Sequence, residues 1–188
     1  MANDFLDRSV QYYRRYGPGR LPFAGRRDVG GGYAGVYAAL GGCLLFALVT
    51  AGLDLLSFGT GFLGVAALLA LPFVLPAAFL AGALTWRVFP TTVPRFGTVA
   101  GVVAATLAYV LAGTAFAVVF AVAETGRTVG TTGKLVAPEV ATGVFDALGF
   151  GGLVALTALL VSAWLVVPIG ALVGSVHERS QRVHAGAR

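Results

Sequence analysis

The chain has 188 residues, of which 57% are hydrophobic and only 11% are charged, and its formal net charge is +5 at pH 7. Soluble domains carry about 25% charged residues, so this chain lacks the charge to cover a water-facing surface. Composition excludes an ordinary soluble domain, a disordered chain and, because Cys43 is the only cysteine, a disulfide-stapled fold. We expect an all-α, polytopic membrane protein. Lys134 is the single lysine among 13 basic residues, a bias typical of GC-rich prokaryotic genes.

The first segment, residues 1–32, is expected to lie in the cytoplasm. On a helical wheel, residues 4–16 separate completely into an apolar and aromatic side and a charged side. Gly17 and Pro18 stop this helix. An amphipathic helix with Tyr and Phe opposite Arg suits the surface of the inner leaflet. A docking face for a partner protein and a loosely ordered tail are the alternatives.

A glycine- and arginine-rich linker covers residues 17–32 and ends on Gly30, Gly31 and Gly32. We interpret it as a flexible hinge whose arginines set the membrane topology. The alternative is an anion site, because helix N-termini attract phosphate groups and Arg26 and Arg27 stand beside the glycines. An anionic lipid headgroup is then the expected ligand.

Four uncharged segments are each long enough to cross a bilayer core of about 30 Å, which needs about 20 apolar helical residues. They cover residues 33–53, 61–84, 97–123 and 148–174. The sequence therefore predicts a bundle of four transmembrane helices over residues 33–174, followed by a tail at 175–188. Pro72 and Pro76 interrupt the second segment, and a re-entrant second segment is the main alternative.

The sequence also predicts the structure of two of the connections between these spans. Residues 87–96 hold a proline and an arginine near each end, which predicts a stiff cytoplasmic turn with Trp86 and Phe96 at the membrane interface. Binding of a partner to this turn is the alternative. Residues 124–147 are expected to form the longest outer loop, with a short helix over 137–146 that has Pro138 in its first turn.

Basic residues set the expected orientation of the spans. Eleven of the 13 lysines and arginines lie before the first span, between the second and third, or after the fourth. By the positive-inside rule both termini face the cytoplasm, and we expect no cleavable signal sequence. Six arginines are the expected contacts for anionic headgroups: Arg14, Arg15, Arg26, Arg27, Arg87 and Arg95.

Small residues recur at four-residue spacing in the first, third and fourth spans. Such rows let helices approach closely, which predicts packing within the bundle or, alternatively, a seam between copies of the chain. Polar residues in the spans are few and uncharged. A candidate polar cavity near the membrane midplane comprises Thr106, Tyr109, Ser162 and Trp164, and internal hydrogen bonds that fix helix register are the simpler interpretation.

No motif in the sequence names a reaction. The expected spans contain no Asp, Glu, Lys, Arg or His, so we expect no catalytic residue, metal or cofactor. Cytoplasmic basic residues are spread over three short segments, which argues against nucleic-acid binding. We expect a non-catalytic accessory or scaffold subunit of a membrane assembly, with a protein partner or a second copy. A small transporter or channel subunit is the alternative, and a lipid-acting enzyme is less favoured.

Overall fold

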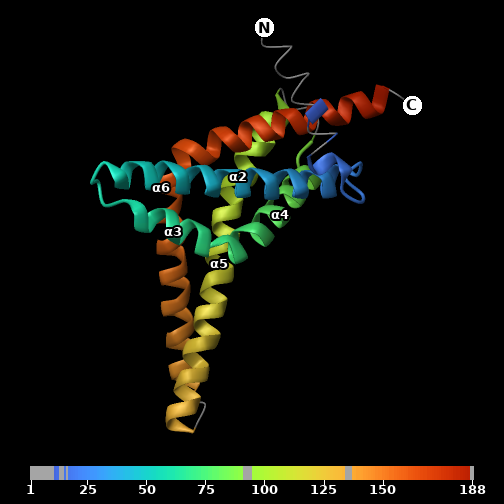
Figure 1. Ribbon diagram of the computed structural model, residues 1–188. Coiled ribbons are helices and arrows are strands. Elements are labelled where there is room, and N and C mark those ends of the chain that lie inside the picture. The colour runs from blue at the N-terminus through green and yellow to red at the C-terminus, as the bar shows by residue number, and fades with distance from the viewer. Residues whose placement is uncertain (1–10, 13–14, 16, 91–94, 134–136, 187–188) are drawn as a thin grey trace.

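A computed structural model describes residues 11–12, 15, 17–90, 95–133 and 137–186, and Figure 1 shows their arrangement. The described residues form helices and turns, with no strand among them. A short 3-10 helix, η1 (Pro18–Arg20), precedes five α-helices, α2 to α6. Helices α2, α4, α5 and α6 are each long and apolar enough to cross a membrane. The chain is thus an all-helical, multi-pass membrane protein. Of the helix expected over 4–16, only residues 11, 12 and 15 are described, and these are helical.

Helix α2 (Arg27–Leu55) begins inside the segment that was expected to be a linker. Asp28 lies in its first turn, where a carboxylate favours the helix N-terminus. Residues 27–32 are therefore helical rather than a flexible hinge. The helix ends before Ser57 and Gly59, which both have positive φ. The Thr60 hydroxyl then donates a hydrogen bond to the main-chain oxygen of Thr50 at 2.9 Å and joins the following helix to α2.

The expected second span is divided into α3 (Gly61–Leu69) and α4 (Leu71–Val88), which meet at Ala70. Pro72 lies at the start of α4 and has no N–H to donate to the preceding turn. Figure 1 shows the two helices meeting at an angle. Pro76 stands inside α4 without dividing it. The interruption is therefore a bend of the helix at Ala70, six residues before Pro76.

Helices α5 (Phe96–Thr132) and α6 (Ala137–Gly186) are much longer than the third and fourth expected spans. At 1.5 Å per residue, the 37 residues of α5 extend for about 55 Å, well beyond a bilayer core. Figure 1 shows the far halves of both helices projecting together as a hairpin. The expectation of an outer loop over 124–147 is wrong, since most of that segment is helical. The helix expected over 137–146 is confirmed as the first turns of α6.

Local hydrogen bonds explain why the polar tip of α5 stays helical. Arg127 donates to both carboxylate oxygens of Glu124, at 2.6 and 3.1 Å, one turn earlier. The hydroxyls of Thr128 and Thr131 donate to main-chain oxygens within the same helix. Gly133, in the left-handed conformation, then closes α5 by donating its N–H to Val129. A polar sequence read as a loop therefore continues the helix.

The bundle is held together by close approaches between main chains. A Cβ atom added at Gly101 would overlap the main-chain oxygen of Gly170, and one added at Gly174 would overlap that of Gly97. Farther along the hairpin, Gly113 and Gly151 face each other in the same way. In the other half of the molecule, Gly35 of α2 packs against Ala78 of α4. The small-residue rows thus serve packing within the chain.

Helix α6 turns sharply between its orange and red parts in Figure 1. Pro168 lies inside this helix, and sharp kinks of helices arise at prolines. The red part beyond the turn lies beside α2. Because of this bend, α6 packs against α5 along most of its length and also lies against α2 after the turn.

Large apolar side chains cover the outside of the helices. Leu48, Leu69, Val122 and Leu160 are all more than two-thirds exposed within the chain. A water-soluble protein does not leave so many large apolar side chains uncovered. Hydrocarbon of a lipid bilayer is the environment that accommodates them.

Candidate functional site: an apolar chamber between the helices

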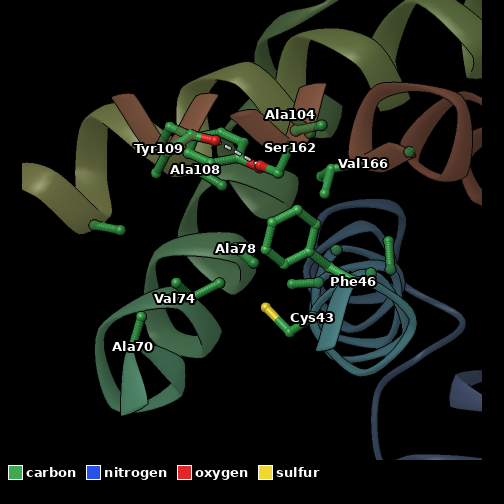
Figure 2. A pocket seen from close by; sticks show the side chains of 18 of the residues that line it. Cys43, Phe46, Ala70, Val74, Ala78, Ala104, Ala108, Tyr109, Ser162 and Val166 are labelled. Atoms are coloured by element: carbon green, nitrogen blue, oxygen red, sulfur yellow. Dashed lines mark hydrogen bonds between the residues drawn. The ribbon is translucent and has the colours of Figure 1, made fainter. Parts of the chain in front are cut away.

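A chamber of about 470 Å³ lies between the helices, with lining residues from all five, α2 to α6. This volume falls within the range of ordinary ligand sites, about 300–1,000 Å³. Most of its lining residues are alanine, glycine or valine. Figure 2 labels ten of them: Cys43, Phe46, Ala70, Val74, Ala78, Ala104, Ala108, Tyr109, Ser162 and Val166.

The chamber exists because small side chains line helices that are held apart at this level. Ala104 and Ala108 of α5 face Val74 and Ala78 of α4 across the space in Figure 2. An alanine leaves room that a leucine at the same position would fill. The bend at Ala70 contributes as well, because Ala70 itself and residues of both α3 and α4 line the chamber.

Three residues with hydroxyl groups line the chamber, Tyr109, Thr157 and Ser162, and two of them are hydrogen-bonded to each other. The Tyr109 and Ser162 oxygens lie 2.5 Å apart, and the Ser162 hydroxyl donates to the main-chain oxygen of Ala158 at 2.6 Å. Since Ser162 has a single proton to donate, Tyr109 is the donor to Ser162. Both hydroxyl protons of the pair are thus donated within the protein, and Figure 2 shows the bond between Tyr109 and Ser162 as a dashed line. None of the described lining residues is Asp, Glu, Lys or Arg, so the chamber is apolar.

The structure brings together only two of the four residues expected to form a polar cavity. Tyr109 and Ser162 line the chamber, whereas Thr106 and Trp164 do not. The Thr106 hydroxyl donates to Val102 of its own helix. Trp164 is 59% exposed, and its indole N–H donates at 2.8 Å to Val161 on the same helix. Both residues satisfy their polar groups on their own helices, so of the four expected residues only Tyr109 and Ser162 meet at the chamber.

One end of the chamber is closed by a cluster of four side chains: Arg27, Trp86, Phe96 and His177. Trp86 contacts Phe96 edge-on, with ring centroids 4.7 Å apart, and His177 at 4.5 Å. Trp86 and Phe96 are 3% exposed and His177 is fully buried. Trp86 and Phe96 therefore pack inside the protein, and their expected level at the membrane interface stays a prediction.

Arg27 takes part in the same cluster. Its guanidinium donates to the main-chain oxygen of Phe89 at 2.6 Å and lies 4.8 Å from the ring centre of Phe96. A cation over an aromatic face contributes about 0.5–2 kcal/mol, more when water is excluded. Arg27 therefore joins the ends of α2 and α4 to the start of α5.

Other hydrogen bonds bring the end of α6 onto this junction. The carboxylate of Glu178 accepts the N–H of Gly97, at the start of α5, at 2.7 Å. This is a favourable place for a negative charge, because helix N-termini carry partial positive charge. Sequence reasoning placed His177 and Glu178 in a tail, and no local pattern marks them as parts of the core. The sequence feature that accompanies their burial is a glycine far away in the chain, such as Gly30, which leaves space for the His177 side chain.

The other described arginines that were expected to contact lipid headgroups lie at the surface. Arg26 is exposed and lies 3.6 Å from the carboxylate of Asp28. Arg15, Arg87 and Arg95 are also exposed, and Arg14 lies outside the described residues. Gly30, Gly31 and Gly32 are buried against His177, Trp86 and Phe79. These three glycines therefore serve helix packing.

Comparison of the chain with protein-family models, with curated proteins and with solved structures finds no match. Within the described residues, no group of three or more His, Cys, Asp or Glu side chains is placed to hold a metal ion. The apolar chamber is accordingly the feature from which a function is argued.

Proposed function

We propose that this protein is a non-catalytic accessory subunit of a membrane assembly and that it holds an apolar molecule between its helices. The observation that carries the proposal is the 470 Å³ chamber with its uncharged lining. A cavity of 150 Å³ in a protein interior already binds small apolar molecules such as benzene. A chamber three times larger, left empty, would forfeit many van der Waals contacts.

The chemistry of the lining supports a binding role rather than a catalytic one. Its Tyr109 and Ser162 hydroxyls are committed to each other and to a main-chain oxygen. The sulfur of Cys43 is among the lining groups in Figure 2, and the labelled residues around it include no base that could activate it. An apolar ligand would therefore be held by contact and released unchanged.

The proposed orientation has both termini in the cytoplasm. It is supported by the distribution of basic residues along the chain. The junction of Arg27, Trp86, Phe96 and His177 then lies near the inner leaflet, and the tip of the α5–α6 hairpin lies outside. The exposed arginines Arg26, Arg87 and Arg95 would contact anionic headgroups at the inner surface.

A small transporter is the second candidate, and the bend at Ala70 favours it. Broken helices next to a central site recur in transporters, and α3 and α4 both line the chamber on either side of the break. A transporter must open its site to both membrane surfaces in turn. Flux of an amphipathic solute into liposomes that contain only this protein would favour transport over the accessory role.

The first experiment is to extract the native protein in polymer discs and identify the proteins and apolar molecules that co-purify. The proposal expects a stoichiometric partner protein and a bound apolar molecule. A chamber-filling variant, Ala108→Phe, should lose the apolar molecule and keep the partner. The matched control is Ala115→Phe, which lies on the same helix at an exposed position outside the lining.

Each result bears on a separate part of the proposal. A monomer or homo-oligomer without any partner would refute the accessory role. An empty chamber in the wild-type protein, or an unchanged bound molecule in Ala108→Phe, would refute the binding role.

A further inference from the structure

The chamber is accessible along the side of α6. Its exposed lining residues are Ala66 of α3 and five residues of α6 between Leu153 and Val161. The other lining residues, such as Trp86 and Gly170, are buried or half-buried. A ligand therefore reaches the chamber sideways, past this part of α6.

The accessible side lies within a long uncharged stretch of α6. No Asp, Glu, Lys or Arg occurs between Asp146 and Glu178. Leu153 is seven residues from Asp146, about 10 Å along the helix, and Val161 is farther still from Glu178. Bilayer hydrocarbon surrounds an apolar surface of this kind, and a charged group placed in hydrocarbon is costly. A molecule that enters from this side is therefore a lipid, and its part near the opening is uncharged.

Thr157 is the polar residue among the exposed lining residues of α6. Other hydroxyl groups of α5 and α6 each donate to the main-chain oxygen four residues earlier: those of Thr106, Thr114, Ser162 and Ser175. Within the part of the chain that the structure describes, the Thr157 hydroxyl makes no such bond to Leu153 and none to another residue. A hydroxyl without a partner is costly in hydrocarbon. Thr157 thus has a proton to donate to an occupant of the chamber.

The other two hydroxyl groups of the lining have already donated their protons. Tyr109 donates to Ser162, and Ser162 donates to the main-chain oxygen of Ala158. Water is a poor occupant of such a space, because a buried water needs two to four polar partners. The chamber therefore suits an apolar molecule with one neutral oxygen that accepts a hydrogen bond from Thr157.

We infer that the chamber binds an uncharged membrane lipid and that Thr157 recognises its polar group, a neutral oxygen. The apolar body of the lipid lies between the helices, and its oxygen lies at the accessible side of the chamber. Carbonyl compounds and alcohols share this chemistry. This inference rests on the proposed function and adds the class of ligand and the residue that selects it.

The test uses the full chain in lipid nanodiscs and five photoreactive probes that share one diazirine-bearing hydrocarbon chain. The probes differ in their polar group, which is absent, a ketone, a hydroxyl, a sulfonate or the headgroup of phosphatidylcholine. All are compared at equal concentration in the bilayer, and cross-linked residues are quantified by mass spectrometry. Binding is measured at Gly42 and Phe46, which line the chamber and are buried, so a probe outside the chamber does not reach them.

The ketone and hydroxyl probes should label Gly42 and Phe46 about three- to tenfold more than the plain hydrocarbon, the factor that one hydrogen bond contributes. Thr157→Val keeps the shape of the side chain and should remove this difference without changing labelling by the hydrocarbon. Unchanged labelling by the hydrocarbon shows that the chamber of the variant is intact. Thr157→Ser retains the hydroxyl and should retain the difference.

The matched control is Thr106→Val, because the Thr106 hydroxyl bonds within its own helix outside the lining. It should change labelling by none of the probes. Stronger labelling by the ketone assigns a carbonyl to the natural ligand, and stronger labelling by the hydroxyl probe assigns an alcohol; both results support the inference.

The contrary outcomes separate this inference from the function on which it rests. Equal labelling by the hydrocarbon and both oxygen probes, or an unchanged pattern in Thr157→Val, would overturn recognition by Thr157 while the binding role stood. Stronger labelling by the sulfonate or the phosphatidylcholine probe would overturn the uncharged class of ligand. Absence of labelling at Gly42 and Phe46 by every probe would overturn the binding function itself.

Discussion

Helices α5 and α6 approach so closely at Gly101 and Gly170 that one methyl group added at Gly101 should lower the stability of the protein. A Cβ atom at Gly101 would overlap the oxygen and carbon of the Gly170 carbonyl. Both are main-chain atoms, so no side-chain rotation relieves the overlap and the two helices must move apart. Overpacking of this kind costs about 1–3 kcal/mol, and alanine recovers up to about 1 kcal/mol through its higher helix propensity.

The reverse substitution meets less resistance. A Cβ atom at Gly170 would lie 2.9 Å from the Gly101 oxygen and 3.0 Å from the Ala105 methyl group, so a small shift accommodates it. We therefore expect Gly101→Ala to lower the free energy of unfolding more than Gly170→Ala. Gly152→Ala is the matched control on α6, since a Cβ there meets nothing within 4 Å. It should be neutral or raise stability by up to about 1 kcal/mol.

The assay is reversible unfolding by sodium dodecyl sulfate in mixed micelles, followed by circular dichroism. A double variant, Gly101→Ala with Gly174→Ala, adds a second test. Both sites lie at the contact between α5 and α6. The second methyl group should therefore lower the free energy of unfolding by less, because the first has already separated the helices. Equal stability of Gly101→Ala and Gly152→Ala would refute the claim that main-chain contact holds α5 against α6.

Three other predictions concern the junction, the hydroxyl pair and the bend. Trp86→Ala should lower the free energy of unfolding by about 3–5 kcal/mol, because it empties a buried aromatic site; a loss below about 1 kcal/mol in the same assay would contradict its burial. Ser162→Ala should cost about 0.5–2 kcal/mol by removing the acceptor of Tyr109, whereas Thr114→Ala, whose hydroxyl bonds within its own helix, should change stability little. Pro72→Ala restores a main-chain donor and should straighten the α3–α4 bend, so spin labels at Leu68→Cys and Leu80→Cys should move apart toward about 18 Å; an unchanged distance would show that the proline does not cause the bend.

The apolar segments expected to cross the membrane were predictable from sequence because length and hydropathy are local properties. Each expected span falls inside a helix or, for residues 61–84, inside the α3–α4 pair. Helix boundaries were less predictable. Residues 124–147 were expected to form a loop because they lie between two apolar spans, but one-turn contacts such as Arg127 with Glu124 keep them largely helical.

Of the four polar residues singled out from sequence, the structure places Tyr109 and Ser162 at the chamber, whereas Thr106 and Trp164 lie outside its lining. All four are polar residues in apolar helices, and the sequence does not show which direction each side chain takes. Thr106 and Trp164 satisfy their polar groups on their own helices, which frees both residues to face outward. Which polar residues meet thus depends on how α5 and α6 are rotated against each other.

Composition and hydropathy alone were enough to make this chain an all-helical membrane protein, because the cost of exposing apolar surface to water is nearly additive along the sequence. The chamber, the burial of Trp86 beside it and the burial of His177 belong to the tertiary structure. They depend on glycines far apart in the chain, such as Gly31 beside Trp86 and Gly101 beside Gly170. Whether a small residue closes a helix contact or lines an open space is decided only by what packs opposite to it.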